Sequence, residues 1–200
     1  MLVLASASPR RRELLAQIGY TFEVRAAHIL EDPLPGEGAV AYVTRLAREK
    51  AEIVFREASK TDGREKDHRD DQSSLVVLGA DTTVTLDEMI LGKPEDATDA
   101  ARMLRLLSGR SHRVITGVAV TTAESTTVAA EATAVRFLTL SDEEIAAYVA
   151  TSEPMDKAGA YAIQGRAARW IPRIEGCYFN VMGLPLALVA SMLEPYCGLR

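Results

Sequence analysis

The first third of the chain alternates between short apolar runs and stretches with the 3.6-residue period of a helix. The run "LVLA" at residues 2–5 predicts a buried strand. Residues 9–18 place two leucines and an isoleucine on one face of a predicted helix, with Ser8 as its N-cap and Pro9 at its first position. An alternating strand and a turn-rich loop follow, and a second helix is predicted over residues 39–58.

The rest of the chain predicts longer strands and three further helices. "SLVVLGADTTVTL", residues 74–86, is a continuous apolar run of the kind found in strands that are covered on both faces. Residues 112–122 and 126–138 predict two neighbouring strands joined by a tight turn. A helix that ends at Gly109 precedes them, the capping box S-x-x-E opens another at Ser141, and an apolar helix closes the chain.

No internal repeat and no clear linker interrupts this succession of elements. We therefore expect residues 1–200 to form a single α/β domain, built as one compact body in two lobes. Residues 59–74 are polar and dense in charge and lack apolar periodicity, so they predict an exposed loop, to which we assign no chemistry.

Composition narrows the possible partners and the compartment. The chain is 48% hydrophobic and 26% charged, and its net charge of -5 gives no global basic field for nucleic acid or for an anionic membrane. No apolar stretch is long enough to cross a bilayer. Cys177 and Cys197 have neither the spacing of a zinc site nor that of a redox pair, which predicts a reduced, cytoplasmic protein. The three histidines are scattered and are assigned no zinc role.

Three consecutive arginines, Arg10, Arg11 and Arg12, lie at the start of the first predicted helix. The helix dipole is positive at this end, so the cations are unfavourable there unless something negative accompanies them. Backbone N–H groups at a helix start bind anions, and guanidinium donors match phosphate oxygens. The run therefore predicts a phosphate site. The alternative is that the arginines are solvated at the surface.

Asp81 interrupts the apolar run at residues 74–86 and is expected at the carboxyl edge of the sheet, where open α/β sheets bind their ligands. Burial and a nearby cation shift the pKa of a carboxylate in opposite directions, and either environment suits a metal ligand or a general base for water. A structural aspartate that caps the following turn is the alternative, which position alone leaves equally open.

Two lysines and a glutamine add to the polar candidates. Lys50 falls inside the apolar stripe of the second helix, so its ammonium is expected to face a polar cavity unless the side chain reaches out to solvent. Lys93 lies in the stiff turn "GKP", which suits a fixed contact or an ordinary turn. Gln164 offers both a donor and an acceptor, as the edge of a base requires, although a glutamine in a loop is usually solvated.

Taken together, these stretches resemble the Maf family of nucleoside triphosphate pyrophosphatases, nearly from end to end. The segments that carry the resemblance are "LASASPRRRELL", "LAREKA", "VLGADTTV", "LGKPED", "LSGRSHRVITGV", "EPMDKAGAYAIQGRAA" and "NVMGLPL". The resemblance implies a mixed central sheet flanked by helices, with two lobes and a cleft. It also implies a homodimer that cleaves a nucleoside triphosphate between the α- and β-phosphates with a divalent metal, magnesium or manganese.

The resemblance also implies roles for single residues. Asp81 matches the family's proton acceptor, and Lys50 and Lys93 join it as the catalytic set. The substrate-binding set is Ser8, Arg10, Arg11, Thr82 and Gln164, of which Arg10, Thr82 and Gln164 match positions that discriminate the base in the dTTP/UTP branch. Glu31 and Asp81 are the metal candidates, although the segment "HILE" before residue 32 departs from the acidic pattern usual in the family.

A non-catalytic nucleotide-binding regulator of cell division or septum formation is the alternative function. A carboxylate at residue 81 beside the cations favours the enzyme, because binding alone gains little from a carboxylate that faces a triphosphate. A hydrolase of another phosphorylated metabolite is a third possibility, which the reaction products would separate from the other two.

Overall fold

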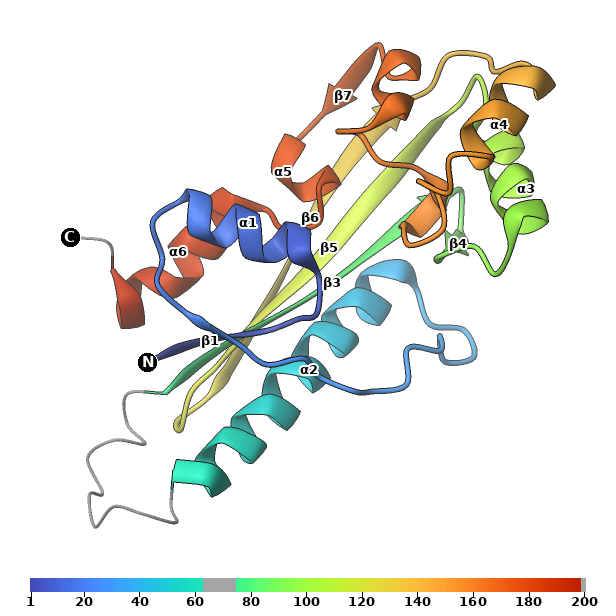
Figure 1. The fold of residues 1–200 in the computed structure, drawn as a ribbon. Helices are drawn as coiled ribbons and strands as arrows, with labels where there is room; N and C mark the ends of the chain where they lie inside the picture. Colours follow the sequence, from blue (N-terminus) through green and yellow to red (C-terminus); the bar gives the residue numbers. More distant parts are fainter. Residues whose placement is uncertain (63–74, 199–200) are drawn as a thin grey trace. The chain divides into compact units, whose positions relative to one another are not determined.

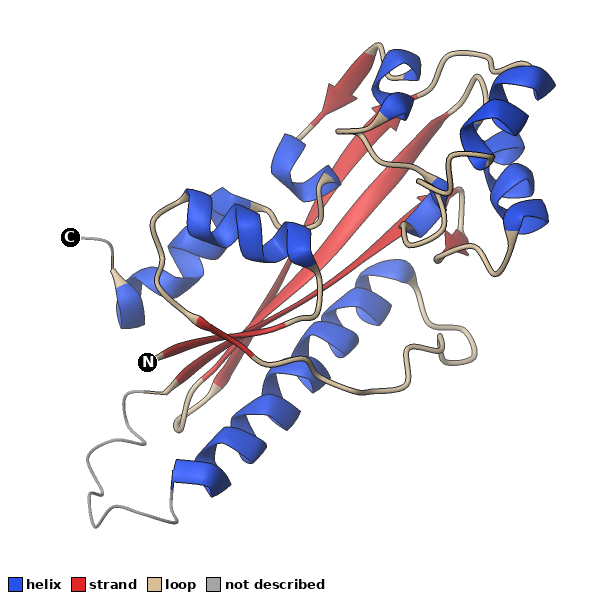
Figure 2. Cartoon of the chain, in the orientation of Figure 1, coloured by secondary structure: helices blue, strands red, loops and turns tan. Residues whose placement is uncertain are grey.

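The computed structural model describes residues 1–62 and 75–198, and it confirms the predicted α/β class (Figures 1 and 2). The strands are β1 (Leu2–Ala5), β2 (Glu23–Val24), β3 (Val76–Leu86), β4 (Met89–Leu91), β5 (Ser111–Thr121), β6 (Thr126–Arg136) and β7 (Arg173–Glu175). The helices are α1 (Pro9–Gln17), α2 (Ala39–Asp62), α3 (Ala97–Leu107), α4 (Asp142–Val149), α5 (Tyr178–Val181), α6 (Leu186–Cys197) and the 3₁₀ turns η2 (Ala158–Ala160) and η3 (Arg166–Trp170).

Within the described residues, the seven strands form one mixed sheet in the order β2-β1-β3-β5-β6-β7, with β4 paired to β3. Strand β1 is parallel to both β2 and β3, and its last residue, Ala5, lies opposite Gly79. Strands β4 and β7 are antiparallel to β3 and β6, respectively. The predicted mixed sheet flanked by helices is therefore confirmed.

By packing, the chain divides into two compact units. The first consists of Met1–Asp81, Thr116–Glu131 and Gly183–Arg200, and the second of Thr82–Ile115 and Ala132–Met182. This division agrees with the expectation of two lobes, whereas the cleft and the single-domain assignment remain predictions.

In the first unit, small residues allow α2 to pack directly on the sheet. A Cβ atom at Gly79 of β3 would lie 2.2 Å from the carbonyl oxygen of Ala47, and one at Gly117 of β5 would lie 2.3 Å from that of Val43. Ala47 and Val43 are fully buried. Glycine is therefore required at both sheet positions, because the backbone of α2 occupies the space where a side chain would be.

The core of the second unit is built around aromatic side chains beneath α3 and α4, which lie side by side (Figure 1). The ring of Phe137 makes edge contacts with His112 and Tyr161 at centroid distances of 5.0 and 4.9 Å. His112 is 2% exposed, and its Nε2 lies 2.8 Å from Oη of Tyr161. Burial lowers the pKa of His112 to about 4, so the ring is neutral near pH 7.

Some boundaries differ from the sequence-based expectation. Helix α2 continues through residues 59–62, where a loop was predicted, and the basic side chain of Lys60 in its last turn suits the negative end of the helix dipole. The remainder of the predicted loop, residues 63–74, lies outside the described residues. The strand expected over residues 20–24 is reduced to the exposed pair that forms β2. In the described ranges, no helix combines the length and apolarity needed to span a membrane.

We predict that Gly79→Ala lowers the free energy of unfolding by about 2–3 kcal/mol, because α2 must move to admit the new methyl group. Denaturant titration measures the change. Gly92→Ala is the matched control, since no atom lies within 4 Å of a Cβ built at that position. Equal stability of the two variants would contradict the close approach of helix and strand.

The buried histidine predicts an acid-dependent loss of stability. The unfolded chain binds a proton at His112 near its ordinary pKa of 6.5, whereas the folded protein resists protonation until about pH 4. Stability therefore falls as the pH drops through this interval, by about 3 kcal/mol in total, and is fully present above it. His112→Phe should remove this part of the slope of unfolding free energy against pH. An unchanged slope would show that the pKa of His112 is the same in the folded and unfolded chain.

Candidate active site

The candidate site is centred on the ammonium group of Lys50. Its Nζ lies 2.6 Å from Oδ1 of Asp81 and 2.6 Å from Oε1 of Glu31. Lys50 and Asp81 are each 7% exposed, while the side chain of Glu31 is 47% exposed. The lysine does not reach out to solvent: its charge is buried and is compensated by two carboxylates from distant parts of the sequence.

Asp81 does not lie at the end of its strand, so this part of the prediction was wrong. Strand β3 continues to Leu86, because its later residues pair with β4. The neighbouring strand β1, however, ends opposite Gly79, and Asp81 therefore lies beyond the carboxyl end of β1. Its carboxylate meets Lys50 from within a strand, which excludes the alternative role of capping a turn.

The N-terminus of α1 lies against the same strand. Ser8 is the N-cap, and its hydroxyl accepts a hydrogen bond from the backbone N–H of Arg11 at 3.4 Å. Arg11 donates from Nε to the carbonyl of Gly183 and from Nη1 to that of Ala80, both at 2.8 Å. Burial lowers the pKa of Arg11, and the charges of Asp81 and Glu31 oppose this effect. Arg10 is half-buried and Arg12 is exposed, so the three arginines differ in their surroundings.

Two residues that no sequence motif marks, Tyr42 and Arg45, contact the segment that carries Glu31. The hydroxyl of Tyr42 donates to the carbonyl oxygen of Glu31 at 2.7 Å, and Nη2 of Arg45 donates to that of Asp32 at 3.1 Å. One signal was available: Tyr42 and Lys50 are eight residues apart on a helix, a spacing that brings them to the same face.

Three predicted residues belong to the second unit: Thr82, Lys93 and Gln164. Thr82 is half-buried and directly follows Asp81 in β3, whereas Lys93 and Gln164 are exposed. The turn that contains Lys93 is tied to η2 by a hydrogen bond from the backbone N–H of Gly159 to the carbonyl of Gly92, at 3.0 Å.

Glu31 and Asp81 are the predicted metal ligands, and their geometry fits a divalent ion. Both place a carboxylate oxygen at the same distance from one ammonium group, so both already face a single cation. Magnesium commonly binds proteins through one or two carboxylates, with substrate phosphates completing its shell. Over residues 1–62 and 75–198, no group of three His, Cys, Asp or Glu side chains gathers to hold a metal.

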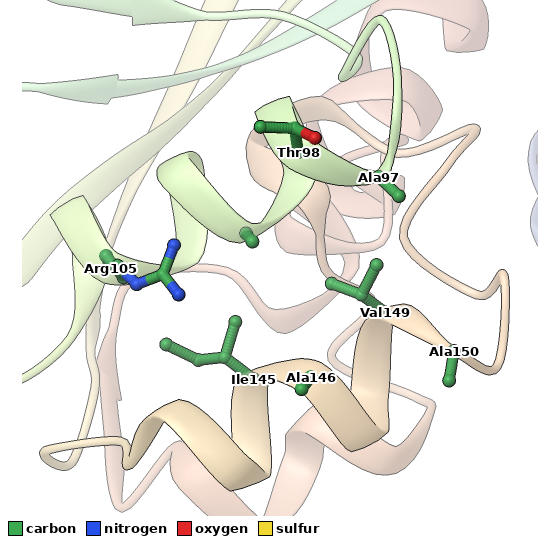
Figure 3. A pocket seen from close by; sticks show the side chains of 8 residues that line it. Ala97, Thr98, Arg105, Ile145, Ala146, Val149 and Ala150 are labelled. Carbon is green, nitrogen blue, oxygen red and sulfur yellow. The ribbon is translucent and has the colours of Figure 1, made fainter.

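A groove of about 450 Å³ lies between α3 and α4 in the second unit (Figure 3). Its lining residues are Ala97, Thr98, Ala101, Arg105, Ile145, Ala146, Val149 and Ala150. The charged member of this set, Arg105, is paired with Asp142 at 2.7 Å. Ligand sites combine apolar surface with a few convergent polar groups, and this groove contains none of the predicted site residues.

The fold and the first-unit geometry define an α/β protein in which a buried lysine joins two carboxylates close to a helix N-terminus, an arrangement suited to phosphate chemistry. The model of the Maf-like protein family matches residues 1–196. The chain therefore belongs to the Maf family.

Its relatives include three bacterial proteins that carry the same name, dTTP/UTP pyrophosphatase. The protein of Geobacter sulfurreducens is 53% identical over 195 residues, which cover 96% of this chain and 95% of the relative. The Aromatoleum aromaticum protein is 50% identical, with coverage of 98% and 95%. The Escherichia coli protein is 47% identical, with coverage of 100% and 94%.

We predict that Lys50→Met lowers the free energy of unfolding by about 2–3 kcal/mol, because Asp81 then keeps a buried charge without its cation. The expected loss is smaller than for an ion pair that is buried on both sides, because the half-exposed carboxylate of Glu31 can turn to solvent when the lysine is removed. The double variant Lys50→Met/Asp81→Asn should regain part of the loss in denaturant titrations. Lys60→Met, at an exposed position of the same helix, is the control. If both lysine variants were equally stable, the ion pair would not hold the site together.

Proposed function

We propose that this protein is a nucleoside triphosphate pyrophosphatase that hydrolyses dTTP and UTP to the monophosphate and pyrophosphate. The name dTTP/UTP pyrophosphatase, which the relatives at 47–53% identity carry, supports this substrate choice. The observation that carries the proposal is the buried Lys50 between Asp81 and Glu31. A carboxylate for water activation and a second carboxylate for a metal are thereby held within reach of one another.

Asp81 is the proposed proton acceptor. A water molecule attacks the α-phosphorus, and its proton passes to the carboxylate of Asp81. The bond from the α-phosphorus to the oxygen that bridges to the β-phosphate breaks, and its electron pair leaves with pyrophosphate. Lys50 keeps the carboxylate oriented through the 2.6 Å contact between Nζ and Oδ1. Positioning and electrostatic stabilisation dominate in chemistry of this type.

The remaining residues of the predicted set are assigned to the substrate. Ser8, Arg10 and the N-terminal N–H groups of α1 form the anion-binding end of the first unit. Two of the donors of Arg11 go to main-chain carbonyls, so part of its role in substrate binding is to fix the wall of the site. Lys93 is proposed as a further phosphate ligand, and Arg10, Thr82 and Gln164 as the residues that discriminate the base.

A divalent ion, magnesium or manganese, held by Glu31 and Asp81 together with phosphate oxygens, would neutralise the charge that develops on the leaving pyrophosphate. A cytoplasmic homodimer completes the proposal, in keeping with the reduced cysteines and with the resemblance to the family.

We expect wild-type protein with magnesium or manganese to release pyrophosphate and monophosphate together from dTTP and UTP, in preference to purine nucleotides. Asp81→Asn should reduce turnover at least about 100-fold while saturable nucleotide binding persists, because the general base is lost but the cations remain. Asp87→Asn, at an exposed position that tolerates asparagine, is the control.

The products decide between the candidate functions. Free phosphate in place of pyrophosphate would point to a hydrolase of a different bond. Nucleotide binding without any release by the wild type would support the regulator. Normal turnover in the Asp81 variant would remove this residue from the role of base.

A further inference from the structure

The segment that carries Glu31 has little apolar anchoring, because Ile29 is half-buried and every residue from 30 to 36 is exposed. We call residues 28–38 the Glu31 loop. All residues from 30 to 36 are exposed, and its two leucines, Leu30 and Leu34, are 83% and 54% exposed. Burial of apolar surface, which fixes most of the chain, therefore does not fix residues 30–36 of this loop.

Polar contacts from α2 hold the loop instead. Nε of Arg45 lies 2.7 Å from Oε1 of Glu37, and its Nη2 lies 2.7 Å from Oε2, which is the paired geometry of a guanidinium on a carboxylate. The same Nη2 donates to the carbonyl of Asp32, and the Glu37 carboxylate accepts from the N–H of Leu34. Arg45 thus binds the loop at two points, the main-chain carbonyl of Asp32 and the side chain of Glu37.

Tyr42 makes the contact closest to the site. Its hydroxyl donates to the carbonyl oxygen of Glu31 at 2.7 Å, while the side chain of the same glutamate meets Lys50. Tyr42 is 8% exposed, and burial raises its pKa to about 12, so the hydroxyl keeps the proton that it donates. The hydrogen bond from Arg45 lowers the pKa of Glu37 to about 2, which keeps that carboxylate charged at neutral pH.

Helix α2 therefore contacts both the main chain and the side-chain carboxylate of Glu31. Tyr42 and Lys50 are eight residues apart on α2, a separation of about 12 Å along a rigid helix. The first holds the main chain of Glu31, and the second meets its carboxylate. Because residues 30–36 are all exposed, these contacts contribute to keeping Glu31 beside Asp81 and Lys50, and their loss is expected to increase the mobility of the segment.

We propose that Tyr42 and Arg45 are positioning residues of the reaction, which fix the Glu31 loop on α2 so that the Glu31 carboxylate stays beside Lys50 and Asp81. The inference rests on the proposed pyrophosphatase function, in which Glu31 acts directly. Tyr42 and Arg45 act through Glu31 and touch none of the reacting groups.

The test compares Arg45→Met and Tyr42→Phe with two exposed controls, Arg48→Met on the same helix and Tyr196→Phe on α6. Amide hydrogen exchange of residues 30–38, measured without metal or nucleotide, reports on the loop itself. We expect exchange to speed up about 10-fold or more in Arg45→Met, which loses charge-assisted bonds, and about 5-fold in Tyr42→Phe, which loses one hydrogen bond. The controls should match the wild type.

Steady-state kinetics with dTTP then separate a positioning role from a purely structural one. We expect kcat to fall about 10-fold in Arg45→Met, with a smaller change in KM, because ground-state binding of the phosphates uses other residues. If Arg45 acts through Glu31, adding Arg45→Met to a Glu31→Gln protein should cost little more than Glu31→Gln alone. Fully additive losses in kcat would overturn the inference.

Two other outcomes would also overturn it. Unchanged hydrogen exchange in Arg45→Met and Tyr42→Phe would mean that α2 does not hold the loop. Faster exchange with unchanged kcat would mean that the held position does not matter to the reaction. If the wild type releases no pyrophosphate, the proposed function itself is contradicted. Faster exchange in the two variants than in the controls would then show that α2 holds the Glu31 loop, but without a role in catalysis.

Discussion

The candidate site depends on one buried positive charge. Lys50 lies on the face of α2 that packs against the sheet, where an uncompensated ammonium group would be strongly destabilising. The two carboxylates that meet it come from β3 and from the Glu31 loop, so one cation joins three segments that are remote in sequence. A charge that would weaken an ordinary core is here the reason why the polar residues of the first unit converge.

The distance between helix and sheet makes this convergence possible. Gly79 lies two residues before Asp81, and Ala47 lies three residues before Lys50, so the backbone contact and the ion pair are parts of one packed interface. A side chain at residue 79 would push α2 outward and separate Lys50 from Asp81 as well. The small residues of this core therefore contribute to the site although they carry no functional group.

The sequence predicts the features that break a local pattern. Lys50 and Asp81 are recognisable because each interrupts an apolar series, and α1 and α4 are recognisable because Ser8 and Ser141 cap them. Their pairing is not predictable, since it depends on the register of α2 over β3. Tyr42 and Arg45 look like ordinary residues of an amphipathic helix, and the Glu31 loop has no period from which its position could be inferred. The strand predicted over residues 20–24 was too long, because only Glu23 and Val24 pair with β1, and the last turn of α2 was missed because no apolar pattern marks it.

The charges around Lys50 also account for Arg11, the middle residue of the arginine run with which the first helix begins. Arg11 and Lys50 are balanced by Glu31 and Asp81, and Arg11 is bonded to the strand that carries Asp81. This inner cluster is therefore close to neutral by itself, and it offers little surplus positive charge to a triphosphate. On the proposed function, the excess would come from Arg10, from Lys93, from the N-terminus of α1 and from a cation that arrives with the nucleotide. A need for a divalent ion would then follow from the internal pairing of the site as much as from the chemistry of the phosphate.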